Sequence, residues 1–444
     1  MKLKNHFLFI SFLITQCFFS GSLFAQSYTN YFTGDTTDVT TAPQKGVVLM
    51  GGAGEDDNAM KWFLERADGG DILVLRTDDS DGYNDYLFSD LGTEVNSVET
   101  IVCNSAEASA DPYVITQIKN AEAIWFAGGD QWNYVSYWRD TEVEDALNYC
   151  VNEKGITLGG ISAGMAIQGQ IIFTAENGSI TSFQALSNPF ANLLTLAYDD
   201  FIDNALMDQI ITDTHFDERN RRGRTTAFLA RILNDYGFRG YAIACNEYTA
   251  VCIDENRIAY AFGTYPDDED YVYFVQVNCI EPYEPEVIED AEQLTWDRND
   301  AALKVIKAQA TTTGSTSLDL KDWETITGGY TWENWWVEDG TFHFTEEATP
   351  LNCADTAIFI QTTSQFNKIN VFPNPAEDVL HVTFDKNLEQ IQIHIFSASG
   401  KLSSHNVSAG TGDLTIPVFS LSAGVYYLQF QAKECVETKM FIKE

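Results

Sequence analysis

The stretch Gly155-Ile-Thr-Leu-Gly-Gly-Ile-Ser-Ala-Gly164 decides the fold class of this chain. A short apolar run leads directly to Ser162, which stands in a Gly-x-Ser-x-Gly frame. Small residues on both sides of a serine allow the backbone to turn sharply from a strand into a helix. The stretch therefore predicts a buried strand, a serine at its carboxyl end and a helix immediately afterwards.

Upstream of this stretch, the same order of apolar run, loop and helix-like segment recurs. Short apolar runs occupy residues 46–50, 71–75, 100–103 and 123–126. Such runs, without polar alternation, are typical of parallel strands that helices cover on both faces. We expect an α/β fold with a mostly parallel sheet and helices on both faces. Ligands bind such sheets outside the carboxyl ends of the strands, which is where Ser162 falls.

A single histidine, His215, lies between the end of the N-terminal leader at residue 25 and residue 342. A nucleophilic serine needs a base that accepts a proton near neutral pH, and histidine is the usual one. We therefore interpret Ser162 as a nucleophile and His215 as its base. The amide of Ala163, directly after the serine, and that of Gly129, from the loop after another strand, are expected to stabilise an oxyanion.

Together these residues resemble the cyanophycinase and dipeptidase E family of serine peptidases over residues 45–265. The resemblance is carried by residues 160–164, by Gly-Gly-Asp-Gln at 128–131, and by Asp-x-His-Phe-x-x-Arg-x-Arg-x-Gly-Arg at 213–224. It implies a serine-type hydrolase on a sheet like that of the class I glutamine amidotransferases. The substrate-binding residues that it implies are Gln131, Asp213, Arg219, Arg221 and Arg224.

The third member of a catalytic triad is less evident from the sequence. The imidazole needs a hydrogen-bond acceptor at Nδ1 to orient it. The family places an acid a short distance beyond the serine, where this chain has no carboxylate in the usual interval. Glu176 lies just before that interval, Asp199 and Asp200 lie after it, and Gln184 would be a neutral substitute. Glu176 is our prediction.

The arginines of the histidine block indicate an anionic substrate, because arginine offers a planar fork of donors that suits carboxylates. Alternatively, single arginines pair with Asp217 or Glu218. We predict a secreted serine peptidase that hydrolyses aspartyl or isopeptide bonds of acidic or cyanophycin-like peptides. Thr214 stands where cyanophycinase carries a glutamine, which argues against cyanophycin itself. The alternatives are a non-catalytic surface binding protein that retains the fold, and an amidase acting on another small amide.

The two ends of the chain indicate export. Residues 1–25 combine an early positive charge, an apolar core and a small residue before Gln26, as a signal peptide does. Residues 366–444 alternate apolar and polar positions, which predicts a small antiparallel β-sandwich. Its Phe-Pro-Asn-Pro (372–375), Ser-Gly-Lys (399–401) and Ala-Gly-Val-Tyr-Tyr-Leu (423–428) segments resemble the C-terminal sorting domain of the type IX secretion system of Bacteroidetes. The resemblance implies passage through the periplasm, the type IX secretion machinery as a partner, and a secreted or cell-surface location.

Four segments follow from these patterns. They are a signal peptide (1–25), a peptidase domain (26–290), a Trp-rich β extension or linker (291–365) and the sorting sandwich (366–444). We expect the tryptophans of the extension mainly to pack in a core.

Composition limits the partners. The formal net charge of −39 makes nucleic acid and anionic membranes poor partners.

Seven cysteines follow the leader, without a Cys-x-x-Cys pair, and histidines do not cluster, so neither a metal site nor a cofactor is expected. The glycine loop at 51–54 lacks a complete nucleotide-binding motif. No mature segment is apolar enough to predict a membrane span. The oligomeric state stays open, with a homodimer as one expectation.

Overall fold

The computed structural model describes residues 27–78, 81–349, 369–384, 388–397, 402–410, 414–419, 421–432 and 435–443. The predicted signal peptide lies outside these residues. The chain divides into two compact units, Met1–Leu351 and Asn352–Glu444. Each unit has its own hydrophobic core and is described here by itself.

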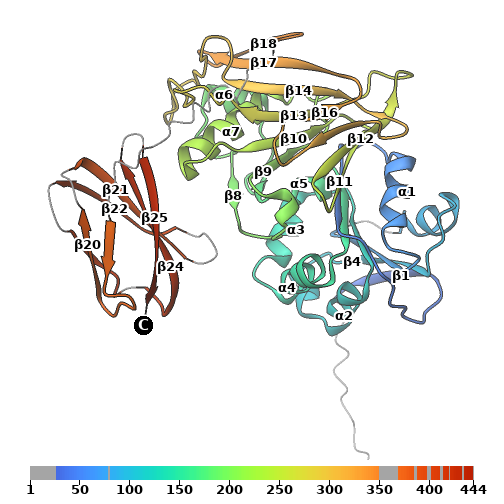
Figure 1. The fold of residues 1–444 in the computed structure, drawn as a ribbon. Coiled ribbons are helices and arrows are strands. Elements are labelled where there is room, and N and C mark those ends of the chain that lie inside the picture. The colour runs from blue at the N-terminus through green and yellow to red at the C-terminus, as the bar shows by residue number, and fades with distance from the viewer. Residues whose placement is uncertain are drawn as a thin grey trace, which may run out of the picture. The chain divides into compact units, whose positions relative to one another are not determined.

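The first unit is built around a ten-stranded mixed sheet whose centre is parallel (Figure 1). Five neighbouring strands, in the order β4–β3–β5–β6–β2, pair in parallel, and the strands outside them pair antiparallel. The spatial order is β1 (Thr29–Gly34), β4 (Ser97–Val102), β3 (Asp71–Arg76), β5 (Ala123–Phe126), β6 (Thr157–Ile161), β2 (Gly46–Met50), β11 (Ala250–Asp254), β12 (Ile258–Tyr265), β15 (Thr316–Asp319) and β16 (Ile326–Thr327).

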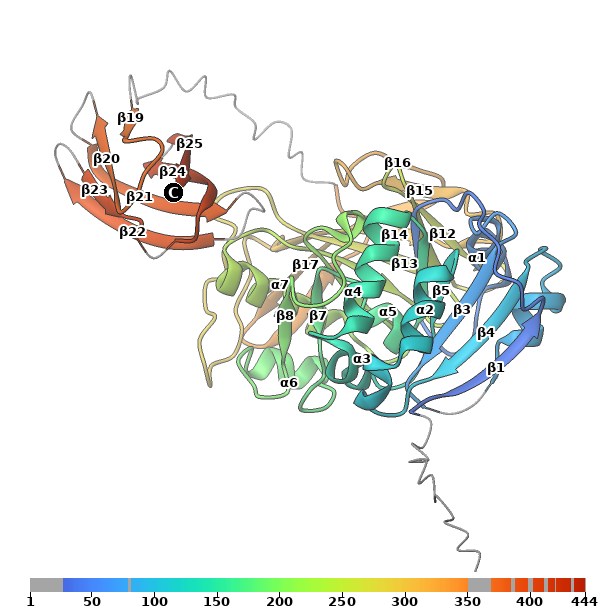
Figure 2. The same ribbon diagram turned by 90° about the horizontal axis from the view of Figure 1, so that it is seen from below.

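The parallel strands are apolar throughout because both of their faces are covered. In β3, Leu73 and Leu75 face one helical layer, whereas Ile72 and Val74 face the other. Figure 2 shows the first layer, α2 to α4, lying across the sheet. The helices are α1 (Asp57–Glu65), α2 (Pro112–Asn120), α3 (Gln131–Trp138), α4 (Glu142–Tyr149), α5 (Ala163–Ala166), α6 (Ser182–Ser187) and α7 (Arg222–Tyr236), with shorter helical turns η1 (Tyr86–Asp90), η2 (Ala106–Ala110), η3 (Cys150–Lys154) and η4 (Ala205–Met207).

A second, eight-stranded sheet packs against the first, and the sequence patterns did not predict it. Apolar residues of β2, β11 and β12 form one core with those of β10, β13 and β14, while α7 covers the opposite face of the second sheet. Its order is β18 (Thr341–Thr345), β17 (Tyr330–Glu338), β14 (Leu303–Gln309), β13 (Tyr271–Val277), β10 (Tyr241–Cys245), β9 (Ile210–Asp213), β7 (Ile171–Phe173) and β8 (Leu196–Tyr198). The expected α/β class with a largely parallel sheet is confirmed, although the sheets are mixed.

The strands of the Trp-rich segment, predicted as a β extension or linker, extend both sheets of the first unit. β14, β17 and β18 join the second sheet, and β15 and β16 join the first. Trp335 is completely buried between α7 and the sheet, so core packing is its role there. The expected boundary at residue 366 falls between described segments, and the compact first unit ends at Leu351.

The second unit is an antiparallel β-sandwich, as predicted. A three-stranded and a four-stranded sheet contribute buried apolar residues to one core, for example Leu380 from the former and Ile393 and Leu428 from the latter. The alternation of buried and exposed residues along its strands is the period-two pattern of a half-buried sheet. The strands are β19 (Ile369–Phe372), β20 (Val379–Phe384) and β23 (Leu414–Pro417) in one sheet, and β22 (Leu402–Gly410), β21 (Leu388–Ser397), β24 (Gly424–Ala432) and β25 (Cys435–Lys443) in the other.

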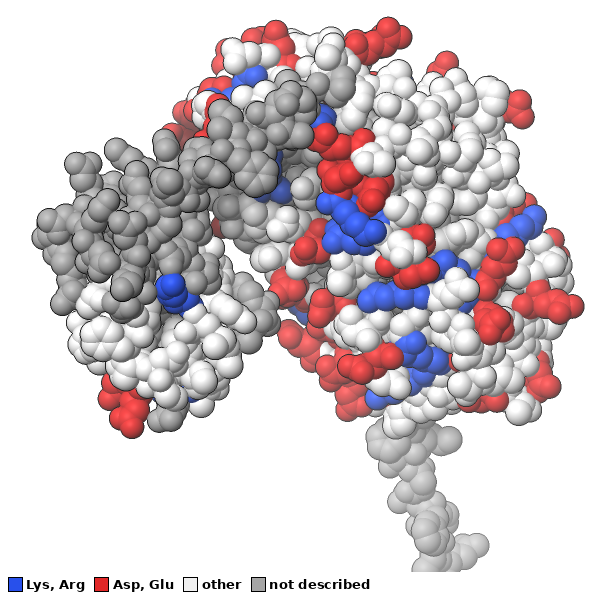
Figure 3. Space-filling model, viewed as in Figure 1, with Lys and Arg blue, Asp and Glu red and all other residues white. Residues whose placement is uncertain are grey.

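The acidic excess of the chain is spread over its surface. On the face drawn in Figure 3, Asp and Glu side chains occur in many places, and Lys and Arg lie between them. Some charged side chains of the first unit form surface pairs, such as Arg139 with Asp200 at 2.6 Å. Surface pairs of this kind contribute little to stability, at most about 1 kcal/mol each. None of the helices in the described part of the chain is long and apolar enough to cross a membrane.

We predict that residues 26–365 fold without the sandwich, because the cores of the two units share no residues. Calorimetry of this truncated protein should show the same unfolding midpoint as the peptidase unit within the full chain. A lower midpoint, or a loss of cooperativity on truncation, would show that the sandwich supports the first unit.

Candidate active site

Ser162 occupies a strained turn between β6 and α5. Its backbone has φ 52° and ψ −109°, a conformation that residues other than glycine rarely adopt. The turn is possible because its neighbours are glycines. A Cβ on Gly160 would lie 2.5 Å from the carbonyl of Gly164, and a Cβ on Gly164 would lie 2.1 Å from the carbonyl oxygen of Phe126. The Gly-x-Ser-x-Gly frame is therefore required by steric contacts on both sides of the serine.

His215 follows β9 and is held against the glycine loop after β2. Its amide donates to the carbonyl of Gly51 over 2.9 Å, and its ring lies directly over Gly52. A Cβ on Gly52 would come within 2.2 Å of the ring carbon Cε1. The glycine loop therefore makes room for the imidazole.

The side chains of Ser162 and His215 meet, as predicted from the sequence. Ser162 Oγ lies 2.9 Å from His215 Nε2, a hydrogen-bonding distance. On the other side of the ring, His215 Nδ1 lies 2.6 Å from Oε1 of Glu247. The three side chains form a continuous Ser–His–Glu chain of hydrogen bonds.

The prediction of Glu176 as the orienting acid is therefore wrong in its geometry, because Glu247 occupies that place. Glu176 lies on the loop after β7, where its amide donates to Thr174 Oγ1 over 3.3 Å. Glu247 reaches the imidazole because β9 and β10 are adjacent parallel strands, so the loops after them start at the same sheet edge. The apolar run 241–245, followed by Asn246 and Glu247, is the sequence signal that could have located this acid.

The environment keeps His215 suited to act as a base. Burial lowers the pKa of His215 below its ordinary value, the hydrogen bond to Glu247 opposes this shift, and the positive charges of Arg219 and Arg221 reinforce it. The net direction is downward. The imidazole is therefore neutral near neutral pH, with Nδ1–H donating to Glu247 and Nε2 free to accept the serine proton.

Of the two predicted oxyanion donors, Ala163 directly follows the serine, and Gly129 lies on a loop that passes near it. Ala163 is the first residue of α5, a position whose N–H has no acceptor within its own helix. The loop carrying Gly129 passes close by, since a Cβ on Gly128 would lie 3.8 Å from Cβ of Ser162. Gly129 has φ 149°, which favours glycine.

Two of the predicted substrate-binding residues are engaged with each other instead. Asp213 and Arg224 form a buried bidentate ion pair, in which Arg224 Nε donates to Asp213 Oδ2 over 2.9 Å. Thr225 donates a further hydrogen bond to the same carboxylate over 2.7 Å. Removing one member of a buried pair typically costs about 3–5 kcal/mol, so this pair anchors α7 to the end of β9.

The other three predicted substrate-binding residues differ in whether their side chains already form hydrogen bonds within the protein. Arg221 is buried and donates to the carbonyl and the hydroxyl of Thr214 over 2.7 and 2.8 Å. Gln131 donates to the carbonyl of Phe173 over 2.9 Å. Arg219 is exposed, and its guanidinium has no hydrogen-bond or ion-pair partner within the described ranges. Arg219 is thus the arginine of this block that remains available for a ligand.

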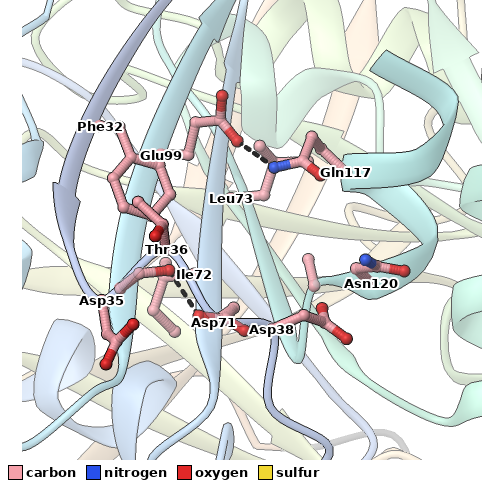
Figure 4. A pocket seen from close by; sticks show the side chains of 12 residues that line it. Phe32, Asp35, Thr36, Asp38, Asp71, Ile72, Leu73, Glu99, Gln117 and Asn120 are labelled. Atoms are coloured by element: carbon pink, nitrogen blue, oxygen red, sulfur yellow. Dashed lines mark hydrogen bonds between the residues drawn. The ribbon is translucent and has the colours of Figure 1, made fainter. Parts of the chain in front are cut away.

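Two cavities differ in their relation to this chain of hydrogen bonds. The pocket in Figure 4, about 70 Å³, lies among β1, β3 and β4, and two of its carboxylates are engaged within the protein: Glu99 accepts from Gln117 and Asp71 from Asn96. A larger cavity of about 760 Å³ borders Glu247 itself. Its acidic lining residues include Glu55, Asp57, Glu218, Glu247, Asp268 and Asp270.

Comparisons with known proteins find similarity in two parts of the chain. Residues 80–260 match peptidase family S51, and residues 370–444 match the secretion system C-terminal sorting domain. A cyanophycinase of Trichormus variabilis is 26% identical over 144 residues, which are 32% of this chain and 44% of that protein. A cyanophycinase of Synechococcus elongatus is 24% identical over 256 residues, covering 54% of this chain and 74% of that protein.

Solved structures show weaker similarity. A putative peptidase E protein from Listeria monocytogenes EGD-e aligns over 50% of this chain and 99% of its own, with 14% identity and a TM-score of 0.33. An immunoglobulin-like β-sandwich protein of the duf3244 family from Bacteroides vulgatus aligns over 17% of this chain and 84% of its own, with 22% identity and a TM-score of 0.16.

The sequence matches define two parts of this chain, a peptidase family S51 domain at residues 80–260 and a secretion system sorting domain at residues 370–444. The chain is secreted or held at the cell surface, as its C-terminal sorting domain indicates. It spans only 44% of the length of the Trichormus cyanophycinase that it matches.

The pH dependence of Ser162 reactivity should report the state of His215. Because the pKa of His215 is lowered, we expect a fluorophosphonate to label Ser162 with an acid limb below pH 6.5. Glu247→Gln removes the negative charge that raises this pKa, so the limb should move further down. The plateau should fall by up to about 10⁴-fold, as when an amide replaces the acid of a serine triad. Glu176→Gln is the matched control and should leave the acid limb and the plateau rate unchanged. Slow labelling of Glu176→Gln together with wild-type labelling of Glu247→Gln would assign the orienting role to Glu176 instead of Glu247.

Proposed function

We propose that this protein is a secreted serine peptidase that uses Ser162, His215 and Glu247 as its catalytic triad. The observation that carries the proposal is the continuous hydrogen-bond chain from Ser162 Oγ through the imidazole to Glu247. A strained serine, a buried neutral histidine and an acid aligned in this order are the parts that nucleophilic acyl transfer requires.

The geometry supports a two-step mechanism. Ser162 Oγ attacks the carbonyl carbon of the scissile bond while its proton passes to His215 Nε2. Glu247 holds the imidazole and stabilises its positive charge, and the amides of Ala163 and Gly129 donate to the oxyanion. The proton then passes from His215 to the leaving amine, leaving an acyl-enzyme. Water, deprotonated by His215, attacks the ester carbon and releases the acid, and the proton returns to Ser162.

We propose that the substrate is an acidic peptide that also carries a positive group. The bond that the enzyme hydrolyses is an aspartyl or isopeptide bond of this peptide. Arg219 offers an exposed guanidinium beside the catalytic histidine, since its amide donates to the carbonyl of His215 over 3.1 Å. Such a group suits a substrate carboxylate. The acidic cavity bordering Glu247 favours a cation on the other side. A cyanophycin-like peptide, with aspartyl and arginine parts, has both charges, and the matched cyanophycinases support this class of substrate.

The proposed cellular route is export by the type IX secretion machinery. The match of residues 370–444 to a secretion system sorting domain supports this partner. We propose that the sandwich serves export and surface attachment and takes no part in the chemistry. A homodimer stays a prediction.

Ser162→Ala should abolish hydrolysis of cyanophycin and of β-aspartyl dipeptides, because only the attacking oxygen is lost. His215→Ala should cost as much as Ser162→Ala, and the double variant should be no worse, since members of one triad are not additive. The hydrolysis rate of each variant is measured by the release of amine, and circular dichroism checks that the variant is folded. Hydrolysis by Ser162→Ala within about tenfold of the wild-type rate would exclude serine catalysis. A wild-type protein that binds these peptides without cleaving them would favour the non-catalytic alternative.

Arg219→Ala should raise KM for an aspartyl substrate about tenfold or more, because a charged hydrogen bond to the substrate is lost. The kcat value and the unfolding midpoint should change little, as the side chain has no partner within the described part of the chain. Arg139→Ala, which removes an arginine in a surface pair with Asp200, serves as the control. Equal KM values for the two variants would take Arg219 out of the substrate site.

A further inference from the structure

Two side chains join the loops that carry His215 and Glu247. Asp217 lies two residues after the histidine, and Asn246 immediately precedes the glutamate. The amide of Asp217 donates to Asn246 Oδ1 over 3.2 Å, and Asn246 Nδ2 donates back to Asp217 Oδ2 over 3.2 Å. This reciprocal pair fixes the separation of the two loops on which the imidazole–carboxylate contact depends.

Asp217 is in turn held by two residues beneath it. Tyr273 on β13 donates its hydroxyl to Asp217 Oδ2 over 2.6 Å, and Arg222 Nε donates to Oδ1 over 3.0 Å. Arg222 Nη2 also donates to the oxygen of Tyr273 over 2.7 Å, which closes the triangle. Burial alone would raise the pKa of Asp217, but Arg222 and Tyr273 bring it below its ordinary value, so the carboxylate stays charged.

The support for Arg222 comes from the Trp-rich segment. Glu333 on β17 places Oε2 3.7 Å from Arg222 Nη1, and Trp335 donates its Nε1–H to the same oxygen over 2.7 Å. The ring of Trp335 lies 5.6 Å and that of Phe344 5.0 Å from the guanidinium carbon, within cation–π range. Glu333 and Trp335 are 2% and 0% exposed. Both lie beyond residues 80–260, the part that matches the peptidase family.

We propose that Asp217 and Asn246 are positioning residues for the triad, and that β17 completes the active site by holding Arg222 against Asp217. The path from Trp335 through Glu333, Arg222 and Asp217 to Asn246 ends beside Glu247. The proposal rests on the proposed function, since it assigns these residues to the setting of the His215–Glu247 contact. It gives the Trp-rich segment a role in catalysis without any contact to substrate.

Asn246→Ala and Glu333→Gln each remove one link of this path, and Tyr273→Phe removes the hydroxyl that donates to Asp217. The test measures the rate at which a fluorophosphonate labels Ser162 across pH, together with the unfolding midpoint. We expect each variant to label about 10- to 100-fold more slowly, because small misplacements of catalytic groups have effects of this size. The acid limb should also move to lower pH. Glu247 would then raise the pKa of His215 less, while Arg219 and Arg221, the other charges acting on the ring, keep lowering it.

Glu324→Gln is the matched control for Glu333→Gln. Glu324 pairs with the buried Lys304 of β14, in the same sheet as Glu333 but away from Asp217, with 2.9 Å between Nζ and Oε1. Each substitution removes one negative charge from an ion pair with a cation of the first unit, Arg222 at 14% and Lys304 at 1% side-chain exposure. We expect Glu324→Gln to label Ser162 at the wild-type rate with the wild-type pH profile. Tyr273→Phe is chosen because it removes a single oxygen and keeps the buried ring in place. Tyr273→Asn or a truncation of β17 would also disturb the core.

The outcomes separate the two proposals. If Ser162 is labelled in the wild type, and Asn246→Ala and Glu333→Gln match its rate and acid limb, the positioning role is wrong and the triad stands. A lower unfolding midpoint with unchanged labelling would likewise reduce the path to a structural one. If Asn246→Ala does not fold, Tyr273→Phe and Glu333→Gln decide. Labelling that persists in Ser162→Ala would overturn the triad and the positioning role together.

Discussion

The hydrogen bond between His215 Nδ1 and Glu247 depends on how two neighbouring strands are paired. In β9 and β10, Asp213 stands opposite Ala244 in a parallel register, so that both strands end at the same level. A slip of one residue would turn the loops away from each other. The first sheet joins this arrangement through the glycine loop, whose Gly51 accepts from the amide of His215 and whose Gly52 accepts from that of Tyr248. The site is therefore assembled where two sheets meet.

The sequence predicted the parts of this arrangement that depend on local pattern. The apolar runs at 46–50 and 123–126 became β2 and β5 without change of bounds, because a strand buried on both faces has few alternatives. Ser162 and His215 could be paired because His215 is the one histidine between residues 25 and 342. Such arguments need no knowledge of how distant segments are placed.

The remaining parts depend on long-range pairing that no local pattern contains. Distance along the chain from Ser162 does not predict Glu247 as the acid. Glu247 lies beside His215 because β9 and β10 are adjacent parallel strands. The arginines of one motif looked equivalent in sequence. In the fold, Arg224 is committed to Asp213, Arg221 to Thr214, and Arg219 is left exposed. Which guanidinium meets a carboxylate is decided by tertiary contacts.

The buried cysteines acquire a meaning from the exported location of the chain. Cys103, Cys150, Cys245 and Cys252 are unpaired and completely buried, and burial raises the pKa of each thiol, to about 12 in Cys103 and Cys150. Cys245 and Cys252, although near in sequence, lie on strands of different sheets. Because the thiolate is the form that exchanges with disulfides, folded thiols of this kind are inert even where the surroundings are oxidising. Outside the reducing cytoplasm, burial in the packed core is what keeps these four thiols from forming disulfides.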